Sequence, residues 1–378
     1  MSVLVSTPEG IEQTLDKTSD LTGKSLLYHR LSTNVLWAKI TRWEFWPFSL
    51  FYFPVAFYWI WITLRARSLF FFTASNPGIE FGGMLGESKD KIFKSMDPNT
   101  IPKTFKLSAD LGIAQVQESL IRENISYPFI LKPDIGERGW MVELIKNEVD
   151  LQKYLDQIQV DYLVQEYIPY NVELGIFYYR YPDQPKGTVS SIVMKEMLSV
   201  KGDGKLTVHE LVQQDVRAKM HLQTLTETKN DILEYIPKYN EEVELVSIGN
   251  HCRGTTFLNG NHLINGKLIK LLDEISTKID GFYFGRFDLR CASIEDLYEG
   301  RNFKIMELNG AGSEPAHIYH PGYSLIQAYK DIIHHLRVLT DISIMNHKRG
   351  VPFMSFREGV KEVLRIRKYN RDKIKLAS

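Results

Sequence analysis

The 378-residue sequence contains only two cysteines and has no excess of charge of either sign. Cys252 and Cys291 form no CxxC pair, which argues against a zinc site and against a disulfide framework. The 46 basic and 46 acidic residues cancel, so a general attraction to nucleic acid is not expected. No cleavable signal peptide is expected either, because the first hydrophobic stretch starts near residue 43. These absences favour a protein of a reducing compartment.

The composition is that of a globular protein, with 24% charged and 44% hydrophobic residues. The length allows two or more domains with their own cores. Changes of composition predict a helical region at 1–67, a small α/β unit at 68–125, a larger domain at 126–340 and a basic helical tail at 341–378. From residue 347 onward this tail has ten Lys or Arg against three acids. The alternation of strand-like and helical patterns predicts an α/β (α+β) fold.

The segment 43–64 is the most apolar part of the chain, and residues 47–64 carry no charge. A run of about 18 uncharged residues is at the lower limit for a membrane span, and tryptophans lie near both of its ends. Pro54 in the middle is expected to kink or break a helix. Three interpretations stay open: a spanning or re-entrant membrane anchor, a helix in the plane of a membrane surface, and a buried or oligomer-forming segment of a soluble protein.

The small unit starts with SLFFFTAS (68–75), which predicts a strand, and continues with the glycine-rich stretch NPGIEFGGMLGES. That stretch is either a plain turn or a source of backbone N–H groups for an anion. A short helix at 89–96, a strand at 104–107 and a helix at 108–123 with Ser108 as its N-cap are predicted to follow.

Two segments near the C-terminal half, GRFDLR and FKIMELNGAGS, read as strands that end in oxygen-bearing side chains. These are Asp288 on the first strand, and Glu307 and Asn309 on the second. Such side chains are either solvated strand ends or ligands of a hard cation such as Mg²⁺, which binds proteins through one or two carboxylates together with substrate phosphates.

Another segment, YPFILKPDIGERGWMVELIKN, predicts a strand that delivers Lys132 ahead of a turn with Gly136 and Gly139. A lysine in this position can reach a phosphate. The next predicted strand, 163–168, contains Glu166, and Glu173 follows seven residues later.

The order of these features over residues 104–323 resembles the ATP-grasp superfamily, in particular its D-alanine–D-alanine ligase branch. The resemblance implies two α+β subdomains that clamp ATP, preceded here by the short α/β unit and the apolar N-terminal helix. Residues 197–212, MLSVKGDGKLTVHELV, are similar to a GDGxxTxxEL stretch in the ATP-grasp domains of cyanophycin synthetase and fused glutathione synthetases. In this stretch Thr207 is a predicted N-cap, with Glu210 in the capping-box position.

Site residues follow from the resemblance by position. The implied catalytic residues are Lys132, on the phosphates, and Arg286, on the oxyanion of the transition state. The implied ATP-binding residues are Lys132, Gly136, Glu137, Arg138, Gly139, Gln165, Glu166, Tyr167, Ile168, Glu173 and Lys195. The implied ligands of two Mg²⁺ ions, or of Mn²⁺, are Asp288, Glu307 and Asn309. The residues implied to contact the substrate or its oxyanion are Gly310, Gly312, Ser313 and His317.

The expected function is a Mg²⁺-dependent ligase that activates a carboxylate as an acyl phosphate and joins it to an amine. A kinase of the same superfamily, and a membrane-associated nucleotide-binding protein without turnover, are the alternatives. The expected partners are small carboxylates and amines, with membrane contact through 43–64 and the basic tail, and the expected location is the cytoplasm or the inner face of its membrane. The polar insertion at 213–257 and the short unit at 68–125 depart from the family where acceptor substrates bind, so the substrates are not implied.

Overall fold

The computed structural model describes residues 34–137, 139–246 and 254–376. Its contacts divide the chain into two compact units, residues 1–46 with 199–243, and residues 47–198 with 244–378. Helices are mixed with sheets, and the strands of the four- and five-stranded sheets pair antiparallel, so the predicted α/β (α+β) class is confirmed. The candidate site residues all belong to the larger unit.

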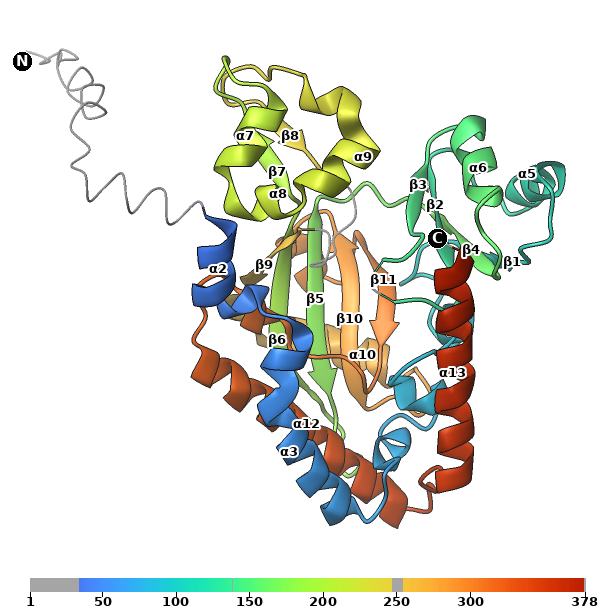
Figure 1. Ribbon diagram of the computed structural model, residues 1–378. Coiled ribbons are helices and arrows are strands. Elements are labelled where there is room, and N and C mark those ends of the chain that lie inside the picture. The colour runs from blue at the N-terminus through green and yellow to red at the C-terminus, as the bar shows by residue number, and fades with distance from the viewer. Residues whose placement is uncertain (1–33, 138, 247–253, 377–378) are drawn as a thin grey trace, which may run out of the picture. The chain divides into compact units, whose positions relative to one another are not determined.

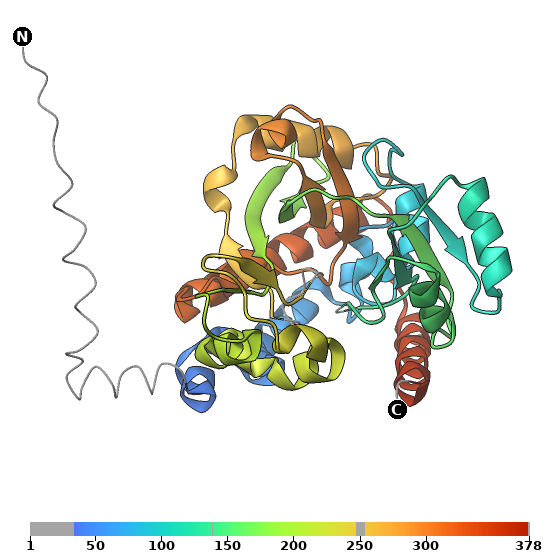
Figure 2. The ribbon, with the colours of Figure 1, turned by 90° about the horizontal axis from the view of Figure 1, so that it is seen from above.

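A four-stranded sheet in the larger unit has the order β1-β4-β2-β3. Its strands are β1 (Thr104–Leu107), β2 (Phe129–Pro133), β3 (Glu143–Ile145) and β4 (Tyr162–Glu166). Strand β1, which the sequence placed in the preceding small unit, pairs with β4. Figures 1 and 2 show the helices α5 (Ile113–Arg122) and α6 (Glu148–Leu155) on the side turned away from the five-stranded sheet.

Helix α5 begins five residues later than predicted. Its N-cap is Gly112, whose N–H donates to the side chain of Gln115 over 2.9 Å, so the cap is made by the residue at N3 and not by Ser108. The helix buries an apolar stripe that includes Val116 and Leu120 against Phe129 and Leu131 of β2. The position of this stripe, and not the predicted cap at Ser108, agrees with the observed start of the helix.

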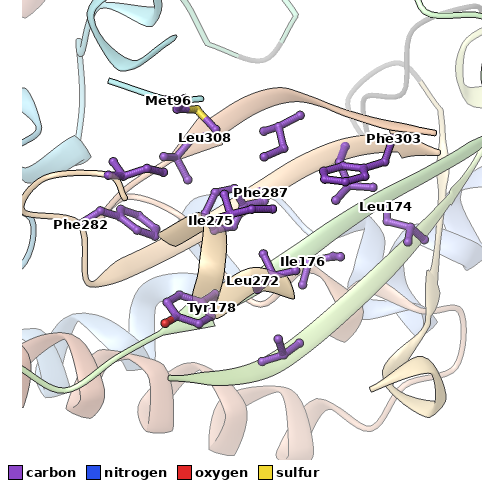
Figure 3. Packing of buried hydrophobic residues seen from close by; sticks show 14 of the residues in the cluster. Met96, Leu174, Ile176, Tyr178, Leu272, Ile275, Phe282, Phe287, Phe303 and Leu308 are labelled. Carbon is purple, nitrogen blue, oxygen red and sulfur yellow. The ribbon is translucent and has the colours of Figure 1, made fainter. Parts of the chain in front are cut away.

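The five-stranded sheet has the order β11-β10-β5-β6-β9. Its strands are β5 (Val172–Tyr179), β6 (Thr188–Glu196), β9 (Thr256–Asn259), β10 (Phe284–Cys291) and β11 (Phe303–Asn309). One face packs on α10 (Gly266–Ser276), and Figure 3 shows Leu272 and Ile275 of that helix beside Ile176 and Phe287 of the strands. Because successive side chains of a strand point to opposite faces, the residues between these core positions point to the other face.

That other face meets α12 (Leu325–Lys348), α3 (Phe48–Ala66) and the short 3₁₀ helix η3 (Phe71–Ala74) in a second hydrophobic cluster. Helix α3 runs without a break through Pro54, contrary to the interruption considered from the sequence. Proline removes one N–H from the helix ladder, but Phe51 and Val55 on either side of it are buried. Packing therefore holds the helix together across the proline.

Residues 68–75 do not form the predicted strand. Phe71 and Phe72 lie in the buried helix η3, where the ring of Trp59 stands 5.4 Å from that of Phe71. An unbroken apolar run has no periodicity, so it does not distinguish a strand from a buried helical turn. Here the segment packs against the helices α3 and α12.

The predicted basic tail forms the helix α13 (Phe356–Leu376). A Cβ atom on Gly359 would lie 2.4 Å from the ring of Phe70, so this glycine lets the helix approach closely. The Tyr369 hydroxyl donates to the Ile135 carbonyl over 2.9 Å, which ties the helix to the loop after β2. The remaining elements of this unit are η4 (Glu80–Gly83), α4 (Lys89–Lys94), η6 (Asn261–Leu263), α11 (Ile294–Tyr298) and η7 (Ala316–Tyr319).

The smaller unit is mainly helical. It contains α2 (Val35–Thr41), η2 (Trp43–Phe45), β7 (Ser199–Lys201), α7 (Val208–Gln214), α8 (Val216–Met220), α9 (Leu222–Leu233) and β8 (Glu242–Glu244). The predicted capping box is confirmed, since the Thr207 hydroxyl accepts from Glu210 N and the Glu210 carboxylate accepts from Thr207 N.

The glycine-rich stretch predicted as a turn packs on the loop after β11. Ala311 N donates to Gly82 O over 3.0 Å, and Gly312 N donates to Gly83 O over 2.8 Å. The contact needs glycine on one side, because a Cβ atom on Gly83 would lie 2.7 Å from the Cα of Gly310. Backbone therefore meets backbone directly beside the end of β11.

We predict that Gly83→Ala destabilises the protein by about 1–3 kcal/mol more than Gly322→Ala, because the new methyl group meets immobile backbone. Both glycines have positive φ, 71° and 80°, but Gly322 has no atom within 4 Å of the added Cβ position. Urea denaturation of the two variants measures the difference. Equal losses in both variants would mean that the contact with Gly310 does not stabilise the fold.

Candidate active site

Four neighbouring strands of the five-stranded sheet direct charged side chains to the face opposite α10. The register places Asp288 of β10 opposite Glu307 of β11, and Arg286 opposite Asn309. On the other side of β10, Arg290 lies opposite Glu173 of β5. A period of two on each strand thus assembles one polar surface from residues that are distant in sequence.

Asp288 is the most enclosed acid of this surface, with its side chain 8% exposed. Arg286 Nε lies 3.1 Å and Lys195 Nζ 3.6 Å from its Oδ1, and Asn309 Nδ2 lies 3.3 Å from its Oδ2. A side chain on Gly175 would come within 2.8 Å of the same carboxylate. Burial by itself would raise the pKa of Asp288, but Arg286 and Lys195 outweigh it and hold the pKa below its usual value.

Glu173 shares these cations. Its carboxylate lies 3.0 Å from Lys195 Nζ and 2.9 Å from Arg290 Nη2. On this surface three cations (Arg286, Lys195, Arg290) alternate with three carboxylates (Asp288, Glu173, Glu307), so their charges balance while the cations keep N–H donors for anionic oxygens. A surface of this kind is suited to phosphate oxygens. The ribose contact predicted for Glu173 stays a prediction.

Lys132 brings the two sheets together. From β2 of the four-stranded sheet its Nζ donates to the Gln165 side chain and to the Met306 carbonyl, each over 3.0 Å. Met306 directly precedes Glu307, so the lysine reaches the strand that carries two of the predicted metal ligands. Burial lowers the pKa of Lys132 to about 8, although the nearby Glu307 acts in the opposite direction. The structure thus brings together the lysine and the acids that the sequence predicted for one site.

Two residues that sequence reasoning missed lie in the same place. Lys89 Nζ donates to Gly136 O over 2.6 Å and lies 3.7 Å from Glu307 Oε1, so it links the loop after β2 to the acids. Glu87 is largely buried and its Oε2 atom has no hydrogen-bond partner, and burial raises its pKa. The glycine-rich stretch could have pointed to both residues, because Glu87 lies near its end and Lys89 follows directly after it.

The predicted metal ligands offer two carboxylates and one amide. In the described part of the chain no three His, Cys, Asp or Glu side chains gather at one point, so Asn309 is needed as the third ligand. The Asp288 and Glu307 carboxylates are in register, and the Glu307 side chain is 35% exposed. Oxygen donors of this type fit Mg²⁺.

The residues predicted to read the adenine are partly engaged elsewhere. Gln165 is buried, accepts from Lys132 and donates to Thr104 Oγ1 over 3.1 Å. Glu166 N donates to Lys103 O over 2.9 Å, and the Ile168 carbonyl accepts from Arg290. Tyr167 lies between them and is half-buried. On the predicted triphosphate loop, Gly139 has a φ of 70° and Glu137 precedes Arg138, which lies outside the described residues.

The loop after β11 differs from the prediction. The N–H groups of Ala311, Gly312 and Ser313 donate to carbonyl oxygens of Gly82, Gly83 and Gly310. They are therefore not directed at a substrate, because the glycine contact described above uses the first two and a turn within the loop uses that of Ser313. The donor that remains close to this loop is the Arg286 guanidinium, whose Nη1 lies 3.4 Å from Glu314 O.

Glu314 is a further residue that the sequence left without a role. Its carboxylate accepts from the hydroxyl of Tyr319 over 3.0 Å and from the hydroxyl of Tyr52 on α3. Burial raises the pKa of Glu314 to about 7, and the Tyr319 hydrogen bond only partly offsets this. A carboxyl group that titrates near neutrality beside Arg286 is suited to accept a proton or to bind an ammonium group.

His317 is placed differently from a residue that waits for substrate. Its Nδ1 lies 2.7 Å from Ser191 Oγ, and its Nε2 lies 3.4 Å from Asp331 Oδ2. Burial lowers its pKa, against the raising effect of Asp331. In this structure the imidazole joins η7 to β6 and α12.

No family model and no curated protein sequence matches this chain. Among solved structures it is similar to a D-alanine–D-alanine ligase from Bacillus anthracis, with 11% identity, a TM-score of 0.41, and 70% of this chain and 69% of that chain covered. A D-Ala:D-Ser ligase from Enterococcus faecalis has 14% identity and a TM-score of 0.40, with 69% and 62% covered. A bifunctional glutathione synthetase from Pasteurella multocida has 14% identity and a TM-score of 0.35, with 67% and 38% covered.

The chain therefore spans less than two thirds of the last two proteins. Since the identities and TM-scores are low, we base the function on the geometry of the site.

We predict that Lys132 makes stability depend on pH above neutrality. Its pKa is lowered from 10.5 to about 8, so between these values the unfolded chain binds more protons than the folded one. The free energy of unfolding should then rise across this window by up to about 3 kcal/mol because of this group. Urea denaturation of the unchanged protein and of Lys132→Met at several pH values separates the contribution of Lys132 from the contributions of tyrosines and Cys291. Parallel curves for the two proteins would contradict it.

Proposed function

We propose that this protein is an ATP-dependent ligase that activates a carboxylate as an acyl phosphate and joins it to an amine. The observation that supports this most directly is the hydrogen bond from Lys132 Nζ to Met306 O, over 3.0 Å. It sets a buried lysine of one sheet against the acid-bearing strand of the other. Between two such sheets a triphosphate can be neutralised from both sides.

The chain supplies the charges that such a transfer needs. Lys132, Lys195 and Arg286 are positioned to neutralise phosphoryl oxygens, and Lys195 keeps its proton because Asp288 and Glu173 outweigh the effect of burial and raise its pKa. Lys89 donates to the Gly136 carbonyl and so holds this loop close to the acids. A loop in this position helps to exclude water from the acyl phosphate, which hydrolyses readily.

Asp288, Glu307 and Asn309 are the residues that would hold Mg²⁺. When bound, the ion polarises phosphoryl oxygens and neutralises their charge. Asp288 is now held by Arg286 and Lys195, so a cation at its carboxylate would take the place of one of these contacts.

The chemistry of the acceptor side follows from Arg286 and Glu314. The Arg286 guanidinium contacts the loop after β11 at the Glu314 carbonyl and can stabilise an oxyanion there. The Glu314 carboxylate can take a proton from an attacking amine, since its pKa of about 7 is close to the ambient pH.

We predict that Asp288→Asn and Glu307→Gln each lower Mg²⁺-dependent ADP release by about 10²-fold or more, because each removes a carboxylate that would hold the Mg²⁺ that neutralises the transferring phosphate. The measurement is ADP release with a panel of small carboxylic acids and amino acids. Glu274→Gln, a change of an exposed acid on α10, is the matched control and should keep full activity.

Circular dichroism of each variant checks that it is folded, and Glu307→Gln is the safer variant because its side chain is 35% exposed. Full activity in both variants would remove the metal assignment. A phosphorylated product without use of the amine would assign the protein to the kinases instead, and ATP binding without ADP release would make it a nucleotide-binding protein.

A further inference from the structure

Helix α3 presents a continuous apolar face that no other part of the described chain covers. Large side chains recur at three- and four-residue spacing along it, and each is between 52% and 70% exposed. They are Leu50, Phe53, Phe57, Ile60, Trp61 and Leu64. In the described chain α3 is the helix long and apolar enough to cross a membrane.

The opposite face of α3 is fixed to the protein. The ring of Phe51 stacks on Tyr329 of α12 with centroids 5.2 Å apart, and Tyr329 donates to the Phe51 carbonyl over 3.0 Å. Near the other end, Arg65 pairs with Asp341 of α12 over 2.6 Å. A helix that crossed a bilayer alone would lose these contacts, whereas a helix lying in the plane of the surface keeps them.

The exposed face has few hydrogen-bonding groups. Among its exposed side chains between Leu50 and Leu64 the indole N–H of Trp61 is the only polar atom, and the half-buried Tyr58, whose ring packs against Trp61, adds one hydroxyl. Interfaces between proteins carry roughly one hydrogen bond per 100–200 Å², which is more than these two groups supply. A hydrocarbon layer requires no such groups, and aromatic rings favour the boundary between lipid and water.

Positive charge lies on α13, which packs on the aromatic residues around η3, as α3 does. Ile62 and Ala66 of α3 and Ile366 of α13 are buried in the same hydrophobic cluster. Between residues 356 and 371, α13 has six basic residues against two acids, a net charge of +4, and the six are exposed. Its apolar residues Phe356 and Leu364 are exposed as well. Such a pairing of apolar and basic groups is complementary to anionic lipid.

The same helix reaches the candidate site. Tyr52, one residue from the buried Phe51 and one from the exposed Phe53, donates its hydroxyl to the carboxylate of Glu314. Glu314 in turn follows the loop after β11 and its carbonyl lies 3.4 Å from Arg286 Nη1. The apolar face and the acceptor side of the site are therefore separated by the width of one helix.

We propose that α3 lies in the plane of an anionic lipid surface and that the site takes an amphiphilic carboxylate or amine from that surface. The first part does not depend on the reaction. The second part rests on the proposed ligase function and specifies its substrate class, a polar head with a long hydrocarbon chain.

Flotation of the full-length protein with vesicles tests the first part. Vesicles of phosphatidylcholine with phosphatidylglycerol should bind the protein, and vesicles of phosphatidylcholine alone should bind it less. Phe53→Glu with Phe57→Glu should weaken binding by about tenfold or more, because two carboxylates would have to enter the hydrocarbon boundary. The matched control is Ile121→Glu with Val149→Glu, which changes two exposed apolar residues of α5 and α6 and should bind as the unchanged protein does.

Three results would overturn this part. The first is binding that survives Phe53→Glu with Phe57→Glu. The second is a dimer in the absence of lipid that these changes dissociate, which would assign the face to a second copy. The third is resistance to alkaline extraction, which would show a spanning helix.

ADP release tests the substrate class. Lauroylglycine is compared with acetylglycine as the carboxylate, and dodecylamine with ethylamine as the amine, in the presence of the same vesicles. One long-chain compound should be used at least about tenfold more efficiently than its short-chain partner, and Phe53→Glu with Phe57→Glu should remove this advantage without slowing the short-chain reaction. Equal use of long and short chains would overturn the substrate class alone. No ADP release with any compound would contradict the ligase function and leave the vesicle result standing.

Discussion

The buried amine of Lys132 is the contact on which the site depends. It joins Lys132 to Met306, which are 174 positions apart, where the end of β2 lies against β11. A charge of this kind is costly to bury, which its lowered pKa of about 8 reflects. The structure tolerates it because Gln165 and the Met306 carbonyl accept its protons, and because Glu307 lies close by. A buried cation held in this way becomes favourable when a polyanion enters.

The five-stranded sheet separates stability from chemistry by its two faces. One face is filled by α10 and apolar side chains such as Phe287 and Ile176. The other carries the charges, and on it Gly175 leaves room for Asp288. Any shift of register by one residue would exchange the two faces, so the core that stabilises the sheet also fixes which side chains face the site. The glycine contact between residues 82–83 and 310–312 then closes the end of the sheet and brings Lys89 and Glu87 with it.

The apolar helix α3 belongs to this arrangement and is more than an appendage. It packs on α12, continues through Pro54 and ends next to the cluster that also holds α13. Its Tyr52 completes the surroundings of Glu314. Helix α3 contributes to the site and exposes large apolar side chains along its length, so a molecule that binds this face would contact the same helix that holds Glu314.

The sequence by itself determined the elements whose pattern is local. Strands such as β1, β10 and β11 and the capping box at Thr207 and Glu210 could be predicted, because alternation and capping involve neighbours in the chain. The joint role of Lys132, Asp288, Glu307 and Asn309 was implied by the family resemblance and stays a prediction. Only the tertiary structure decided the helical turn at 71–74, the pairing of the amides of residues 311 and 312 with the carbonyls of residues 82 and 83, and the roles open to Lys89, Glu87 and Glu314. The physical reason is that these depend on which distant segment packs alongside: burial, backbone pairing and pKa are set by neighbours in space, and no local pattern contains them.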